Sequence, residues 1–64
     1  ADAYNNLGVA YGLKGDDEKR VYYYELAVAK DPHYVRGYLN LASAYSQRGD
    51  TQRAEEYLKA AGKT

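Results

Sequence analysis

The sequence of this chain repeats itself with a period of 34 residues. Residues 3–16 read AYNNLGVAYGLKGD, and residues 37–50 read GYLNLASAYSQRGD. A fixed period of this length is typical of supersecondary units that stack on one another. The identical pairs at this spacing are Tyr4 and Tyr38, Asn6 and Asn40, Leu7 and Leu41, Ala10 and Ala44, Tyr11 and Tyr45, Gly15 and Gly49, Asp16 and Asp50, Tyr23 and Tyr57, and Ala27 and Ala61.

Each period carries the apolar spacing of two helices. Apolar residues between Tyr38 and Tyr45 fall at i, i+3, i+4 and i+7, which places them on one helix face, and residues 54–61 repeat this spacing. In each period a Gly-Asp pair follows the first helix, where glycine can end one helix and aspartate can cap the next. Asp31-Pro32 ends the second helix because proline disfavours helical geometry in the preceding residue. We therefore expect helices over about residues 2–14, 17–30, 34–48 and 51–61.

Length and composition exclude several classes of protein. A chain of 64 residues forms one small unit with a thin core. Nine basic and nine acidic residues cancel, so charge gives no case for nucleic acid or an anionic membrane as partner. No apolar run is long enough to span a bilayer, and there is no signal-peptide pattern. We expect a soluble protein, with the cytoplasm favoured, and the missing initial Met suggests a mature product or an excised piece of something longer.

The repeated motifs resemble the tetratricopeptide repeat family. The resemblance implies an all-α solenoid of two helix-turn-helix units, with four antiparallel helices in right-handed superhelical stacking. The first unit would span residues 1–34 and the second, truncated before its closing Asp-Pro, residues 35–64, within one structural domain. The matching residues of the first unit are Tyr4, Leu7-Gly8, Tyr11, Gly15-Asp16, Tyr24, Ala27 and Asp31-Pro32. Those of the second are Tyr38, Leu41-Ala42, Tyr45, Gly49-Asp50, Ala54, Leu58 and Ala61.

The resemblance also implies a binding surface. In this family the first helices of successive repeats line a concave groove that holds an extended peptide or a partner helix. Asn6 and Asn40 are the main candidates there, because a side-chain amide can donate to and accept from a peptide backbone at once. The alternative is that these are ordinary solvated helix positions. The groove residues that the family pattern implies are Asn5, Asn6, Val9, Leu13, Tyr34, Arg36, Leu39, Asn40, Ser43 and Gln47.

Several positions depart from the family pattern. One subtype of the family clamps a terminal carboxylate, but it needs cations where this chain has Asn5, Asp2 and Asn40, so we do not expect that activity. The family usually has a small residue where this chain has Arg20. We expect its stem to lie along the helix with the charge in water, where Gly8 leaves room; the alternatives are an ion pair or a partner contact.

No group of residues predicts chemistry. His33 is the single histidine and has no cysteine to share a metal with. Residues 16–18 are acidic, and helix capping explains them. Residues 62–64 read GKT, but they lack the upstream glycine, the strand and the following helix of a phosphate-binding loop. We expect neither an enzyme nor a cofactor.

We therefore predict a module that binds a protein or peptide partner. The alternative is a structural unit that assembles into homo-oligomers and binds no peptide. Two repeats without capping helices would leave apolar surface uncovered, and such a patch normally marks a contact site. A designed repeat would fit the all-Tyr aromatic set, but Arg20, Asp17 and Lys30 argue against a consensus design. The predicted self-association face comprises Tyr22, Tyr23, Tyr57 and Ala61.

Overall fold

The computed structural model, which describes residues 1–64, contains four α-helices and no strand. The all-α prediction is confirmed, and no predicted helix limit differs from the observed one by more than one residue. The helices are α1 (Asp2–Leu13), α2 (Asp17–Lys30), α3 (Val35–Gln47) and α4 (Thr51–Gly62).

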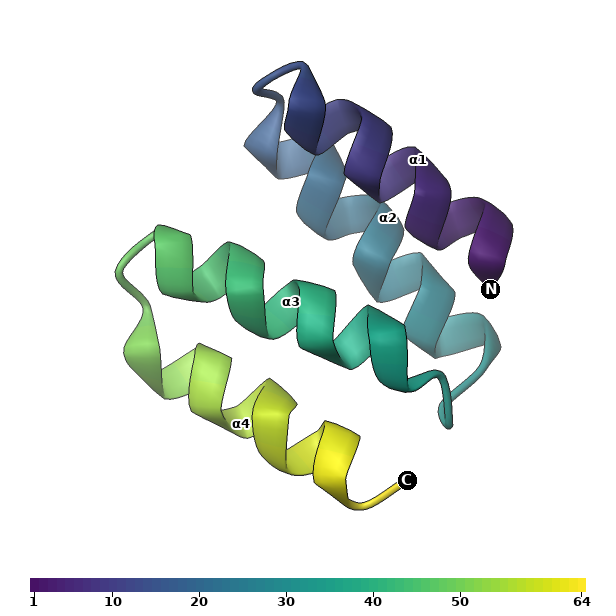
Figure 1. Ribbon diagram of the computed structural model, residues 1–64, viewed down its shortest axis with the longest axis vertical. Helices are drawn as coiled ribbons and strands as arrows, with labels where there is room; N and C mark the ends of the chain where they lie inside the picture. The colour runs from purple at the N-terminus through teal and green to yellow at the C-terminus, as the bar shows by residue number, and fades with distance from the viewer.

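The helices form two antiparallel pairs packed side by side (Figure 1). We call α1 with α2 the first pair, and α3 with α4 the second pair. Helix α2 packs against both α1 and α3, so α1 and α4 lie at opposite ends of the row. The Cα atoms span only 12 Å in the thinnest direction, against 30 and 26 Å in the others. The molecule is therefore a thin slab.

The turn inside each pair has the same geometry. Gly15 and Gly49 both have φ of +84°, in the left-handed region that glycine adopts without a Cβ clash. The side chain of Asp16 then accepts a hydrogen bond from the backbone N–H of Lys19 at 3.2 Å, which caps α2. The equivalent aspartate caps α4 through a bond of the same length. The repeated Gly-Asp pair thus fixes both reversals of the chain, as the sequence predicts.

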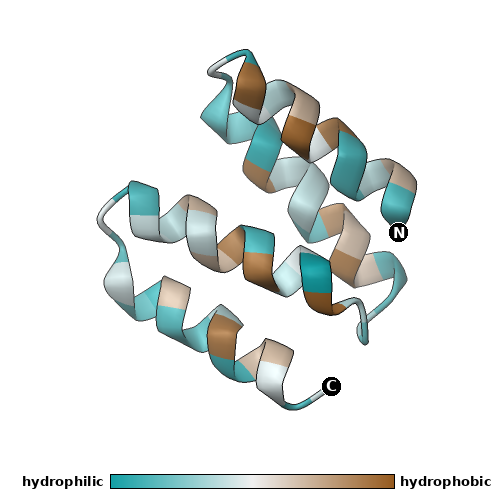
Figure 2. Cartoon of the chain, in the orientation of Figure 1, coloured by the Kyte–Doolittle hydropathy of each residue, from teal (hydrophilic) through white to brown (hydrophobic).

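The core lies where the two pairs meet. Its buried residues come from α2, α3 and α4, and Leu41 at its centre has no exposed surface. Figure 2 shows hydrophobic residues along every helix, interrupted by polar ones, as expected for a slab with a narrow interior. The core cluster comprises Val21, Tyr24, Leu41, Ala44, Tyr45 and Ala54, with Val28 and Tyr57 packed against it.

Within the first pair, α1 and α2 lie close together at Gly8. A Cβ atom placed on Gly8 would lie 2.5 Å from the Tyr24 ring and 3.0 Å from the carbonyl oxygen of Arg20. No side chain fits at that distance without a shift of α2. Gly8 therefore packs directly against α2, the second helix of its own pair.

Candidate functional site

Most of the predicted groove residues lie open to solvent on α1 and α3. Their spacing of three or four residues places them on one face of each helix. We call this surface the α1/α3 face and define it by its exposed members, Asn6, Val9, Leu13, Leu39, Ser43 and Gln47. Arg36 is also exposed, and Tyr34 and Asn40 are half-buried.

Asn5 corrects the predicted groove. Its side chain is only 5% exposed, because it lies against α3 and accepts a hydrogen bond from Nδ2 of Asn40 at 2.8 Å. This bond joins the first helices of the two pairs. Asn5 therefore serves the contact between the helices, and Asn40 has one of its amide donors already occupied. Asn6 keeps its whole side-chain amide free for a partner.

One end of the α1/α3 face is closed by a polar cluster. Asp2, at the start of α1, accepts hydrogen bonds from the hydroxyl of Tyr34 and from Nη2 of Arg36, the latter at 3.0 Å. The Tyr34 bond, together with the charge of Arg36, lowers the pKa of the Asp2 carboxyl despite the opposing effect of desolvation. Tyr34 and Arg36 are thus engaged within the chain, although the sequence places them among the groove residues.

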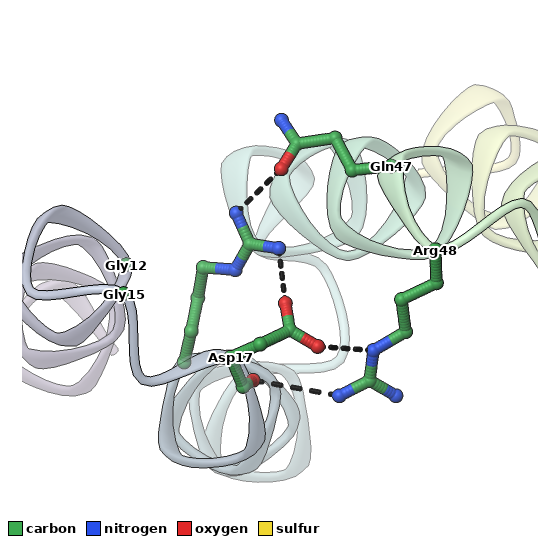
Figure 3. A pocket seen from close by; sticks show the side chains of 6 residues that line it. Gly12, Gly15, Asp17, Gln47 and Arg48 are labelled. Carbon is green, nitrogen blue, oxygen red and sulfur yellow. Dashed lines mark hydrogen bonds and ion pairs between the residues drawn. The ribbon is translucent and has the colours of Figure 1, made fainter.

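The other end holds a second and denser cluster (Figure 3). Arg20 of α2 donates to Oε1 of Gln47 at 2.9 Å and pairs with the carboxylate of Asp17. The second oxygen of that carboxylate pairs with Nε of Arg48, just beyond the end of α3. A pocket of about 290 Å³ opens here, and its lining consists of Gly12, Gly15, Asp17, Arg20, Gln47 and Arg48.

The sequence analysis placed Arg20 incorrectly. Its side chain is only 15% exposed, so the charge does not lie in water; the ion-pair alternative is the one observed. Gly12, rather than Gly8, provides the room, because a Cβ atom on Gly12 would lie 2.6 Å from Cδ of Arg20. Nε of Arg20 is buried and has no hydrogen-bond partner within the chain. The arginine therefore packs over a glycine and keeps one N–H unused.

Asp17 is ionised more readily than a free aspartate. Desolvation alone would raise the pKa of its carboxyl, but the hydrogen bonds from Arg48 and Arg20 and their positive charges lower it further than desolvation raises it. The net shift of the pKa is downward from 3.8. At neutral pH Asp17 is a carboxylate held between two guanidinium groups, one from each helix pair.

The residues of the predicted self-association face lie on two helices and differ in burial, and the rings of Tyr22 and Tyr23 meet with centroids 5.2 Å apart. Tyr23 is half-buried and its ring stacks on that of Tyr11 with centroids 5.5 Å apart. Tyr57 packs on the core and stacks on Tyr45 at 5.6 Å, so it faces inward rather than toward a missing neighbour. Tyr22 is 58% exposed on α2, while Ala61 is half-buried on α4.

An apolar surface that the sequence analysis did not single out lies on the outer side of α1. Leu7 is 41% exposed, whereas Leu41, one period later, is fully buried. Ala10 and Ala44 differ in the same way. Leu41 and Ala44 on α3 are buried against α2 of the preceding pair. Helix α1 has no preceding pair that could bury Leu7 and Ala10. Leu7 and Ala10 are identical to their equivalents in the second pair, so only their exposure in the structure identifies this surface.

None of the four helices combines the length and the apolar character that a bilayer crossing requires. No three side chains among His, Cys, Asp and Glu are grouped so that they could hold a metal ion. His33 lies in the turn between the pairs, where its backbone N–H donates to Asp31 at 3.1 Å.

Comparison with known proteins gives two kinds of match. Family models described as tetratricopeptide repeat match residues 1–34 and residues 23–56. The chain is also 39% identical over 56 residues to ALBINO3-like protein 2, chloroplastic, from Arabidopsis thaliana. That match covers 88% of this chain and 11% of the Arabidopsis protein, so the chain spans a small part of its relative. The relative is named as chloroplastic, which gives no support to the cytoplasmic location expected above.

Proposed function

Because the chain belongs to the tetratricopeptide repeat family, we propose that it binds a peptide segment or a partner helix along its α1/α3 face. Repeats of this family generally act as non-catalytic modules for protein–protein interaction. The peptide-binding role of this particular face, and the absence of catalysis, are parts of the proposal. The whole activity of the longer Arabidopsis relative is not transferred.

Exposed apolar side chains on this face are the observation that supports the proposal. Val9, Leu13 and Leu39 are 41%, 87% and 45% exposed, and they come from the first helix of both pairs. Large apolar side chains in water are costly, and a contiguous group of them normally marks a contact surface. A partner that covers these three residues would gain the free energy of their burial.

Polar side chains beside the apolar ones would set how a partner lies. Asn6, Ser43 and Gln47 are exposed on the same face and carry both donors and acceptors. An extended peptide offers unpaired backbone N–H and C=O groups, which these side chains can satisfy. A partner helix satisfies its own backbone and would rely on the apolar contacts alone. Mutation of the polar side chains should therefore weaken the binding of an extended peptide but not that of a partner helix, whereas mutation of the apolar side chains should weaken both.

A selection from a library of random peptides tests the proposal. The chain is immobilised, the selected peptides are sequenced and synthesised, and their affinities are measured by fluorescence anisotropy. Leu39→Ser should weaken binding roughly five- to tenfold, because it removes an apolar contact worth about 1 kcal/mol or more. Leu58→Ser is the matched control, since Leu58 is 51% exposed but lies on α4. Equal losses in both variants would contradict the proposed face.

Self-assembly remains the second candidate, and the exposed outer side of α1 favours it. Leu7 and Ala10 occupy positions that α3 buries against the preceding pair, so another helix pair can stack there. A second copy of the chain could supply that pair. Sedimentation equilibrium over a wide range of concentration should then show association that Leu7→Glu abolishes and Leu39→Glu preserves. A monomer at every concentration would rule this candidate out.

A further inference from the structure

The pocket between the two pairs has a surplus of hydrogen-bond donors. A guanidinium group has five N–H donors. Arg20 uses donors toward Gln47 and Asp17, and its buried Nε has no partner. Arg48 directs its donors to the carboxylate and the backbone carbonyl of Asp17. Several N–H groups of both arginines therefore have no acceptor in the chain.

The charges of the lining are not balanced either. Two guanidinium cations face a single carboxylate, that of Asp17, so one positive charge is left over. Asp17 has two acidic neighbours in the chain: Asp16 caps α2 and lies 3.9 Å from Nζ of Lys19, and Glu18 is exposed and does not line the pocket. No hydrophobic residue lines the pocket. A site with spare donors and one spare positive charge favours an anion over a neutral or apolar ligand.

The pocket, with a volume of about 290 Å³, has ample room for a carboxylate group. Gly12 and Gly15 form one wall, and neither has a side chain that would fill the space in front of Arg20 (Figure 3). Gln47 belongs both to the lining and to the α1/α3 face. A peptide that lies along this face would therefore reach the pocket with a side chain.

We propose that this pocket binds the carboxylate of an acidic residue in the partner, held by Arg20 and Arg48. The proposal rests on the proposed function for the identity of the partner, but the anion site itself does not depend on it. The planar fork of a guanidinium matches the two oxygens of a carboxylate. Neither arginine stands at a position where the carboxylate-clamping subtype of the family carries its cations, so this site is separate from that clamp.

Titration with small anions, followed by NMR, tests the site directly. The probes are acetate, inorganic phosphate and, as the uncharged control, acetamide, all at constant ionic strength. Acetate should shift the Arg20 Nε–H signal and the amides of Gly12 and Gly15 in a saturable way, and acetamide should not. Absence of saturation, or the same response to acetamide, would overturn the proposal. Tighter binding of phosphate than of acetate, by more than about tenfold, would overturn the assignment to a carboxylate.

Variants then tie the response to the pocket. Arg20→Gln should weaken acetate binding roughly tenfold, because it removes the fork and its charge. Arg53→Gln is the matched control: it removes the same charge from an exposed arginine of α4 that lines no pocket, and should change binding less than about twofold. If Arg20→Gln does not fold, Arg20→Lys keeps the charge, loses the fork, and should still weaken binding. Equal weakening in the Arg20 and Arg53 variants would overturn the assignment.

The two proposals fail in different ways. If the chain binds peptides but does not respond to acetate, the anion site is contradicted and the α1/α3 face is supported. If the chain responds to acetate but selects no peptide, the face is contradicted and the anion site is supported. If both hold, a selected peptide with Glu should bind roughly tenfold more tightly than the same peptide with Gln, and this preference should disappear in Arg20→Gln.

Discussion

The two helix pairs place residues of different size at equivalent positions of the repeat. In the first pair a glycine, Gly8, faces the large ring of Tyr24. One period later these positions hold Ala42, which is larger than Gly8, and Leu58, which is smaller than Tyr24. The same exchange recurs one turn along, where Gly12 lies under Arg20 and the second pair has Ser46 and Ala54. At both sites the first pair sets a glycine against a large side chain, whereas the second pair has two residues that are closer to each other in size.

The difference between the pairs extends to their neighbours. Helix α3 lies between α2 and α4, whereas α1 has only α2 packed closely along it. Identical residues consequently have different exposures in the two pairs. The same substitution at equivalent positions of the two pairs should therefore lower the free energy of unfolding by different amounts.

Leu41→Ala should be the most destabilising change. Leu41 is fully buried, so its loss leaves a cavity and costs about 2–5 kcal/mol of unfolding free energy. Leu7→Ala removes the same atoms from a side chain that is 41% exposed, and should cost less than about half as much. Urea denaturation of both variants measures the difference. Equal costs would show that the outer side of α1 is covered in solution.

Gly8→Leu should follow. The new side chain would meet the ring of Tyr24, from which even a Cβ atom would be only 2.5 Å away, and overpacking of this kind costs about 1–3 kcal/mol. Gly62→Leu is the control, because a Cβ atom there meets no atom within 4 Å. Thermal denaturation followed by circular dichroism compares the two. An unchanged midpoint in Gly8→Leu would contradict the packing of the first pair.

Gly12→Ala should be harmful only in the presence of Arg20. A Cβ atom at residue 12 lies 2.6 Å from Cδ of Arg20, while alanine in place of a helical glycine by itself stabilises by up to about 1 kcal/mol. In a background that carries Arg20→Ala, as in the second pair, the substitution should become stabilising. A double-mutant cycle should therefore give a coupling of about 1 kcal/mol between the two positions. A coupling near zero would separate Arg20 from Gly12.

Asp17→Asn should have the smallest effect, and one that depends on pH. The folded-state pKa of Asp17 is lowered, so its ionised form contributes stability above the ordinary value of 3.8, and this contribution is lost as the pH falls through the lower folded pKa. The side chain is 38% exposed and solvent screens its pairs, so the contribution is less than about 1 kcal/mol. Denaturation at pH 7 and below pH 3.8 should show that the difference in unfolding free energy between the original chain and Asp17→Asn becomes smaller at the lower pH. A difference that does not change with pH would mean that the lost stability does not come from the charge of Asp17.

Local signals carried most of the fold prediction. The Gly-Asp pairs and the apolar spacing act within a few residues, so the sequence predicts both turns and all four helices. The environment of Arg20 depends on Gly12, eight residues earlier, and on Gln47, which only the packing of the two pairs brings near. Asn5 is likewise buried by a residue 35 positions away. Such contacts leave no local signal, and sequence reasoning therefore placed Asn5 in the binding groove and the charge of Arg20 in water.

Helix α4 has a different kind of attachment from its neighbours, and this bears on how the chain opens. Hydrogen bonds or ion pairs between side chains link α1 to α3 through Asn5 and Asn40, and α2 to the end of α3 through Asp17. Helix α4 is held by Ala54 in the core, by the stacking of Tyr57 on Tyr45, and by the guanidinium of Arg53 over the Tyr45 ring at 5.4 Å. Motions that separate α4 from α3 therefore break apolar and cation–π contacts but no ion pair between helices. Amide hydrogens of α4 should exchange with solvent deuterium before those of α2 and α3, so that the slab opens from one edge rather than everywhere at once.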